Sequence, residues 1–88
     1  MARVSGNLRI SVLFFGRVRE FTGFSADALE VPEGTTLSSL FDRYATRFPQ
    51  LAAFRASLVA SCNEEFAPWD TRLADNDTIA FLPPVSGG

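Results

Sequence analysis

The fold is decided by the segment with the clearest helical period in the chain, Leu37-Ser38-Ser39-Leu40-Phe41-Asp42-Arg43-Tyr44-Ala45-Thr46-Arg47-Phe48. Its apolar residues recur at steps of three and four, which places them on one helix face: Leu37, Leu40, Phe41, Tyr44 and Phe48. Thr35 or Thr36 is a suitable N-cap. Pro49 disfavours helical geometry at the residue before it, so we expect the helix to end at about Arg47.

Short apolar segments on both sides of this helix alternate as strands do. The first has one apolar face made by Leu8, Ile10, Val12 and Phe14, and it turns Leu13 and Phe15 to the opposite face. The strands that we expect are residues 8–15, 28–32, 58–62, 66–67 and 78–82. Residues 17–22 should form a helical turn closed by Gly23, residues 50–56 a loop with at most one further helical turn, and residues 63–65 and 75–77 turns.

The order strand, strand, helix, strand, short strand, strand is the β-grasp pattern of ubiquitin-like proteins. It predicts an α+β fold in which a mixed sheet packs against one main helix. With 88 residues, the chain has room for one domain, residues 1–88, and for one modest core.

The composition excludes several function classes. A net charge of −2 and scattered arginines disfavour nucleic-acid binding, and no apolar run is long enough to cross a membrane. The single Cys62 excludes an internal disulfide and fits a reducing compartment, so we expect a cytoplasmic protein with Cys62 as a small buried apolar residue. The chain has no lysine and therefore cannot accept its own terminus as an isopeptide.

The last six residues, Pro83-Pro84-Val85-Ser86-Gly87-Gly88, follow directly on the last strand. The two prolines can neither extend a helix nor donate to a sheet ladder, so we expect residues 83–88 to form a flexible, extended tail. It could carry the terminal carboxylate about 20 Å from the body. Two terminal glycines leave that carboxylate without side-chain obstruction.

The ending Asp77-Thr78-Ile79-Ala80-Phe81-Leu82-Pro83-Pro84-Val85-Ser86-Gly87-Gly88 resembles that of the MoaD-like sulfur carriers, the small subunits of molybdopterin synthase. The similarity extends over nearly the whole chain. Other parts of it are Val12-Leu13-Phe14-Phe15-Gly16-Arg17-Val18-Arg19-Glu20, Asn63-Glu64-Glu65 and Trp69-Asp70.

This resemblance implies a function in molybdenum cofactor biosynthesis. An adenylyltransferase that resembles ubiquitin-activating enzymes would use ATP to adenylate Gly88, and sulfur would then replace the adenylate to give a thiocarboxylate. The tail, Pro83 to Ser86 with Gly87 as the clearance residue, would enter the large subunit of a heterotetramer and donate sulfur to the pyranopterin precursor. The resemblance also implies that the first and last strands lie parallel at the centre of the sheet.

The residues themselves offer no catalytic machinery. The chain has no histidine, no phosphate-binding glycine loop and one cysteine, so we expect no activity of its own, no bound cofactor and no metal. Most of the nine phenylalanines should lie in the core. The remainder could form a partner-docking patch, for which the candidates are Phe15, Phe66, Leu82, Pro83 and Val85.

Three other functions fit the same tail. The chain could be a sulfur carrier for thiamine synthesis or tRNA thiolation, with unchanged chemistry at Gly88. It could be a ubiquitin-like modifier of protein lysines, or an interaction module with an inert tail.

Overall fold

A computed structural model describes residues 7–82 of the chain. Its elements follow the predicted order: β1 (Asn7–Phe14), α1 (Gly16–Thr22), β2 (Ala26–Pro32), α2 (Leu37–Arg47), a 3₁₀ helix (Pro49–Ser57), β3 (Val59–Cys62), β4 (Glu65–Ala67) and β5 (Thr78–Leu82). The predictions for Pro83, Pro84, Val85, Ser86, Gly87 and Gly88 lie outside the described residues.

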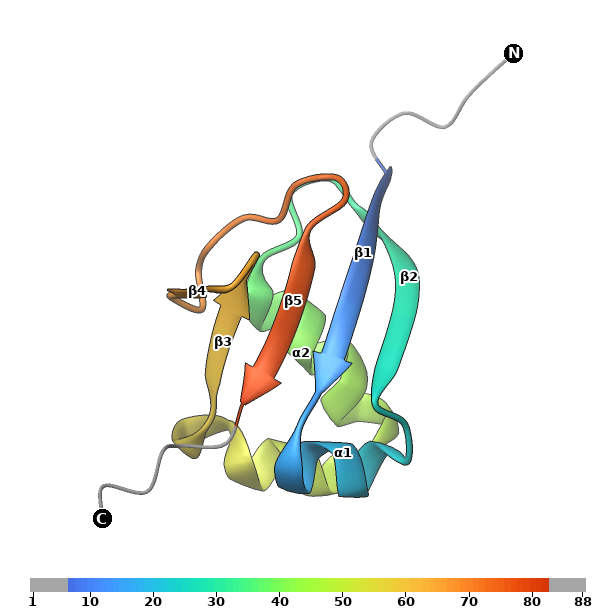
Figure 1. Cartoon of the computed structure of the whole chain (residues 1–88), viewed down its shortest axis with the longest axis vertical. Coiled ribbons are helices and arrows are strands. Elements are labelled where there is room, and N and C mark those ends of the chain that lie inside the picture. Colours follow the sequence, from blue (N-terminus) through green and yellow to red (C-terminus); the bar gives the residue numbers. More distant parts are fainter. Residues whose placement is uncertain (1–6, 83–88) are drawn as a thin grey trace.

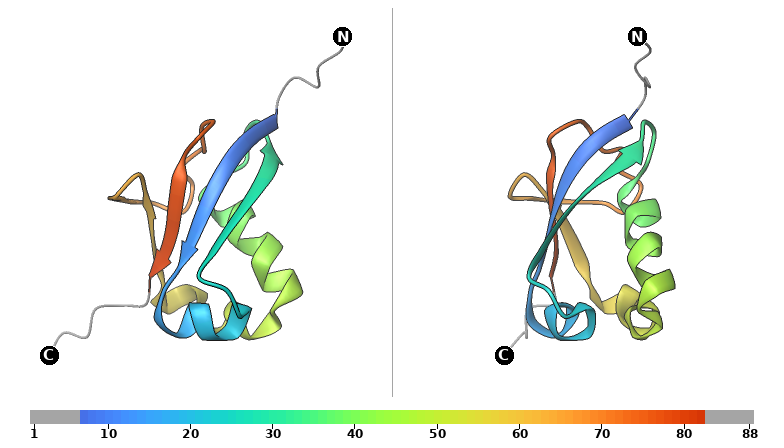
Figure 2. Two further views of the ribbon diagram at one scale, coloured as in Figure 1. Left: turned by 45° about the vertical axis from the view of Figure 1, so that its right-hand side comes forward. Right: turned by 90° about the vertical axis from the view of Figure 1, so that its right-hand side faces the viewer.

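The strands form one mixed sheet in the order β2-β1-β5-β3-β4. β1 and β5 are parallel neighbours, with Val12 opposite Ile79 and Phe14 opposite Phe81, and the other pairs are antiparallel. α2 crosses one face of this sheet, as Figure 1 and the turned views of Figure 2 show. The β-grasp prediction is confirmed, including the parallel pairing of the first and last strands.

The helix boundaries follow the predicted signals. α2 begins after Thr36, whose side-chain oxygen accepts a hydrogen bond from the Ser39 backbone N–H at 3.2 Å, and ends at Arg47 before Pro49. α1 ends at Gly23, which has φ of +85° and donates its backbone N–H to the Arg19 carbonyl. Glycine adopts this left-handed conformation without the steric cost that a side chain brings.

The core lies between the sheet and the helices and is rich in aromatic side chains. Phe14 and Phe81, from the two central strands, meet Phe41 and Tyr44 of α2, with ring centroids of the closest pair, Phe14 and Tyr44, 5.0 Å apart. Trp69 stacks on Phe81 at 6.0 Å. Seven of the nine phenylalanines lie in this core or pack against it, and the two exposed ones are Phe15 and Phe66.

Several details differ from the prediction, including the starts of β1 at Asn7 and of β3 at Val59, each one residue away from the expected position. Residues 50–56 are not a loop but part of the 3₁₀ helix, which starts at Pro49, a residue whose fixed φ suits a first helical position. β2 begins two residues before the predicted start, at Ala26, because its pairing with β1 continues to Leu13. Phe15 follows β1 rather than ending it, and the hairpin turn contains only Asn63 and Glu64, since Glu65 already pairs with Cys62. None of the helices within residues 7–82 is long and apolar enough to span a membrane.

Candidate functional site: the end of the last strand and the open sheet face

The last strand, β5, places the start of the predicted tail at one end of the sheet. β5 lies between β1 and β3, and its last residue, Leu82, pairs with Val59. α1 contacts β5 at this end of the molecule. Leu82 therefore has a fixed position at the end of the central strand of the sheet.

The sheet face opposite the helices is lined with small and apolar side chains. One row crosses all five strands in register: Ala26, Leu13, Ala80, Ser61 and Phe66. Since side chains on neighbouring residues of a strand point to opposite faces, this row lies on the face opposite the main hydrophobic cluster, which contains none of its residues. Ala80 and Ser61 are nevertheless buried, each being 8% exposed. The helices leave this face uncovered (Figure 2).

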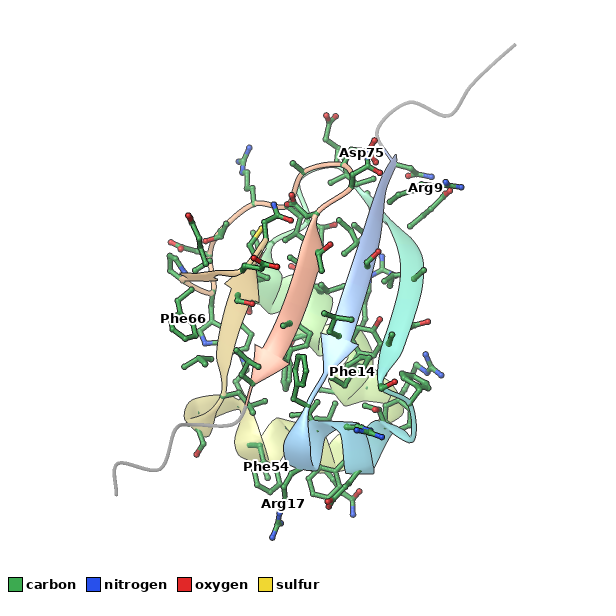
Figure 3. The ribbon with its side chains drawn as sticks, in the orientation of Figure 1. Arg9, Phe14, Arg17, Phe54, Phe66 and Asp75 are labelled. Atoms are coloured by element: carbon green, nitrogen blue, oxygen red, sulfur yellow. The ribbon has the colours of Figure 1, made fainter. Side chains whose placement is uncertain are left out.

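An open hollow of about 560 Å³ lies over this face. It is lined by residues of β1, β3, β4 and β5, by Phe15 after β1 and by the turn between β3 and β4, namely Leu13, Phe15, Ser61, Asn63, Glu64, Phe66, Thr78, Ala80 and Leu82. Phe66 is 74% exposed and Phe15 is 44% exposed, whereas Leu82 is half-buried. Phe66 lies at the β4 edge of the sheet (Figure 3). Exposed aromatic rings around a shallow apolar surface are typical of a protein-docking site.

The structure thus brings together the three described docking candidates, Phe15, Phe66 and Leu82, around one hollow. The sequence placed Leu13 on this face, but sequence reasoning missed Ala80 and Ser61, which also line the hollow. The alternation of residues along β1 was the signal that placed Leu13 on this face. Ala80 and Ser61 are too small to stand out in a hydrophobic pattern.

Asp77 fixes the other end of β5. Its side-chain oxygens accept hydrogen bonds from the Ala74 backbone N–H at 2.7 Å, the Asn63 Nδ2 at 2.9 Å and the Cys62 thiol at 3.3 Å. Burial alone would raise the pKa of Asp77, but these donors outweigh it and hold the pKa below its ordinary value. The predicted turn at residues 75–77 is present, yet the prediction that its carboxylates are surface groups is wrong for Asp77, which is 8% exposed.

Cys62 is half-buried, packs against the core and donates its thiol hydrogen to Asp77. Burial, followed by the hydrogen bond to the Asp77 carboxylate and the negative charge of that group, raises the pKa of the Cys62 thiol to about 11. The thiol is therefore protonated at neutral pH and is a poor nucleophile. Within residues 7–82, no three His, Cys, Asp or Glu side chains gather closely enough to hold a metal ion.

The sequence and the fold of this chain are similar to those of known proteins. The ThiS family model matches residues 12–88. The chain belongs to the ThiS family. A molybdopterin synthase sulfur carrier subunit from Arabidopsis thaliana is 34% identical to it over 84 residues, covering 96% of this chain and 88% of the relative. The corresponding subunit from Escherichia coli is 39% identical over 82 residues, covering 90% of this chain and 99% of the relative.

Solved structures of similar proteins have the same fold as this ThiS-family chain. The putative molybdopterin converting factor subunit 1 from Pyrococcus furiosus superposes with a TM-score of 0.79 at 24% identity, over 89% of this chain and 99% of that one. A complex of subunits 1 and 2 of the molybdopterin-converting factor from Helicobacter pylori contains a chain that superposes with a TM-score of 0.60 at 24% identity, over 92% of this chain and 100% of that one.

Proposed function

We propose that this protein is the sulfur carrier subunit of a molybdopterin synthase and that Gly88 carries the sulfur as a C-terminal thiocarboxylate. The observation that carries this proposal is the similarity, at 34% and 39% identity over nearly the full chain, to sulfur carrier subunits of molybdopterin synthase. The family match also runs through to Gly88, so it includes the residue that we assign to the chemistry.

The chemistry begins with a carboxylate, which is a poor electrophile because its charge is shared by two oxygens. An adenylyltransferase partner joins one carboxylate oxygen of Gly88 to the α-phosphorus of ATP and releases pyrophosphate. A sulfide equivalent then attacks the carbonyl carbon and AMP leaves, so that sulfur replaces one oxygen. The absence of a side chain at Gly87 and Gly88 leaves the path to this carbon open.

The described residues contribute position and docking rather than catalysis. β5 holds the start of the tail at the centre of the sheet, and the hollow around Phe15, Phe66 and Leu82 provides a contact surface beside it. We propose that a large subunit docks there and receives the tail. The complete assembly is a heterotetramer in which two carriers bind a dimer of large subunits. The catalytic groups belong to the partners, and ATP is bound by the adenylyltransferase.

Sulfur donation returns the chain to its starting state. The thiocarboxylate sulfur attacks a carbon of the pyranopterin precursor and displaces an oxygen leaving group, which gives a thioester between Gly88 and the precursor. Water then attacks the thioester carbonyl, the bond between that carbon and sulfur breaks, the sulfur stays on the precursor and the Gly88 carboxylate is restored. The single cysteine fits a reducing compartment, and we place this cycle in the cytoplasm.

Intact-mass analysis tests the proposal. The full chain, incubated with its activating enzyme, ATP and a sulfur source, should gain the mass difference between sulfur and oxygen, and the chain without Gly88 should not. Circular dichroism of the shortened chain should match that of the parent, because the tail begins after the last residue of β5. A full-length chain that keeps its mass under conditions where a known carrier is loaded would refute the proposal.

A pull-down with the large subunit separates this pathway from other thiolation pathways. We expect the large subunit of the same organism to be retained by the full chain. Retention by a thiazole-forming partner instead, with loading at Gly88 intact, would keep the carrier chemistry and reassign the pathway.

A further inference from the structure

Charged residues are divided unequally between the two ends of the sheet. The end at which β5 finishes contains α1, α2 from its midpoint onward and the 3₁₀ helix (Figure 1). Within residues 7–82, the backbone of this end carries five arginines and three acidic residues: Arg17, Arg19, Arg43, Arg47, Arg55, Glu20, Asp27 and Asp42. Arg55 turns its guanidinium away from this end, donating to the Ser38 hydroxyl in the first turn of α2 at 2.9 Å and lying 4.4 Å over the Trp69 ring. The opposite end has two arginines and seven acidic residues: Arg9, Arg72, Glu30, Glu33, Glu64, Glu65, Asp70, Asp75 and Asp77. Figure 3 shows Arg17 at the first end and Asp75 at the second.

Four of these arginines form what we call the arginine end: Arg17, Arg19, Arg43 and Arg47. All four are exposed. The one ion pair within residues 7–82 joins Arg9 to Glu30 and lies at the acidic end, so no carboxylate of the described chain neutralises the arginine end by direct pairing. Asp27, an acidic residue of the same end, accepts a hydrogen bond from the Tyr44 hydroxyl at 2.8 Å.

The four arginines of the arginine end come from two helices at the base of the sheet. Arg17 and Arg19 lie on α1, which contacts β5. Arg47, at the end of α2, lies over the rings of Phe48 and Phe24, with its guanidinium carbon 5.1 and 5.9 Å from their centroids. Phe24 lies two residues after the end of α1, so this stacking joins the end of α2 to the segment that follows α1.

We infer that the arginine end docks on an acidic surface of the adenylyltransferase that activates Gly88. This inference rests on the proposed function. An enzyme that takes the tail into its active site must bring its surface to the end of the sheet where β5 finishes. A guanidinium binds a carboxylate through two parallel hydrogen bonds, so arginine is well suited to such a contact.

The division of charge also orients the encounter. The chain as a whole has a net charge of −2 and would be repelled weakly by an acidic surface. Because one end is locally positive, an acidic partner attracts that end and repels the other, which turns the tail toward the active site. Such steering raises association rates by about 10-fold to 1,000-fold and weakens as salt screens the charges.

Two double variants of the full chain test the inference. Arg17→Glu with Arg19→Glu reverses charge at the arginine end, and Arg9→Glu with Arg72→Glu makes the same change in total charge at the acidic end. All four side chains are exposed. Circular dichroism checks the fold, and a third variant, Arg17→Gln with Arg19→Gln, removes the charge without introducing carboxylates. The measurements are the association rate constant with the adenylyltransferase at several salt concentrations, and loading of Gly88 by intact mass.

We expect the first variant to associate about 10-fold more slowly than the parent at low salt, with a smaller difference at high salt. The Gln variant should lie between them, and the acidic-end variant should stay within about twofold of the parent. Equal slowing of both charge-reversed variants, or no slowing of either, would overturn the inference. Failure of the parent to be loaded at all would instead count against the proposed function, because association is measured without loading.

Discussion

The two ends of β5 are built from different interactions. At the start of the strand, Asp77 is buried and accepts three hydrogen bonds, and the Thr78 backbone N–H donates to the Asn63 side chain at 2.9 Å. At the end of the strand, Leu82 is half-buried beside an open apolar hollow. One end is held by polar groups that satisfy one another. The other has an open apolar surface.

This difference explains how a small domain can hold its last strand firmly and still expose the place where the tail begins. Buried hydrogen bonds are specific in geometry, so the network at Asp77 fixes both the register and the position of β5. The end near Leu82 needs no such network, because Phe81 next to it is fully buried against Phe41 and Trp69. Variants at the two ends should therefore affect different measurements.

The largest effect is expected from Asp77→Ala. This change leaves the Ala74 N–H and the Asn63 side chain without their acceptor, which should cost about 2–3 kcal/mol in the free energy of unfolding. Urea denaturation measures it. Asp70→Ala is the matched control, since Asp70 is exposed, and it should change stability by less than about 0.5 kcal/mol. Equal stabilities of the two variants would mean that the network does not hold β5.

The contribution of Asp77 should also depend on pH. The pKa of Asp77 is lower in the folded chain than in an unfolded one, so its charged form stabilises the fold above the unfolded pKa of about 3.9. This stability is lost as pH falls through the folded pKa. Asp77→Asn, which cannot titrate, should therefore be less stable than the parent at pH 7. The difference between their free energies of unfolding, measured by urea denaturation, should become smaller at acidic pH. A gap that stays constant down to pH values well below the unfolded pKa would contradict the assignment.

Much of the end near Leu82 could be predicted from the sequence, and little of the end near Asp77. The alternation in β1 and the two prolines after Leu82 are local signals, so the end of the last strand and the placement of Phe15 on the open face followed from them. Phe66 was proposed as a docking candidate without such a signal, and it is exposed. The Asp77 network joins residues that are 3, 14 and 15 positions apart along the chain. No local pattern distinguishes this buried acceptor from its exposed neighbour Asp75, and the sequence of this turn is equally compatible with two surface carboxylates.

The hairpin turn beside this network offers a smaller effect of opposite sign. Glu64 has φ of +74°, a left-handed conformation that side chains disfavour, and Asn63 before it has φ of +52°. Asn-Gly is the preferred pair for such a two-residue turn, so Glu64→Gly should stabilise the protein by about 0.5–1 kcal/mol. Glu65→Gly is the control and should destabilise it, because Glu65 lies in β4, where glycine costs backbone entropy. Thermal unfolding of both variants decides between these outcomes.

The smallest effect on stability is expected at the open hollow, from Phe66→Ala. Phe66 is 74% exposed, so its removal should change the free energy of unfolding by less than about 0.5 kcal/mol. If the hollow is where the large subunit docks, the same change should weaken that binding by about 10-fold or more, because aromatic side chains contribute strongly at protein interfaces. Isothermal titration calorimetry with the large subunit measures the affinity, and Glu65→Ala, the neighbouring residue on β4, is the matched control. If Phe66→Ala binds the large subunit as tightly as the parent does, the large subunit docks elsewhere, and the open hollow is not its binding site.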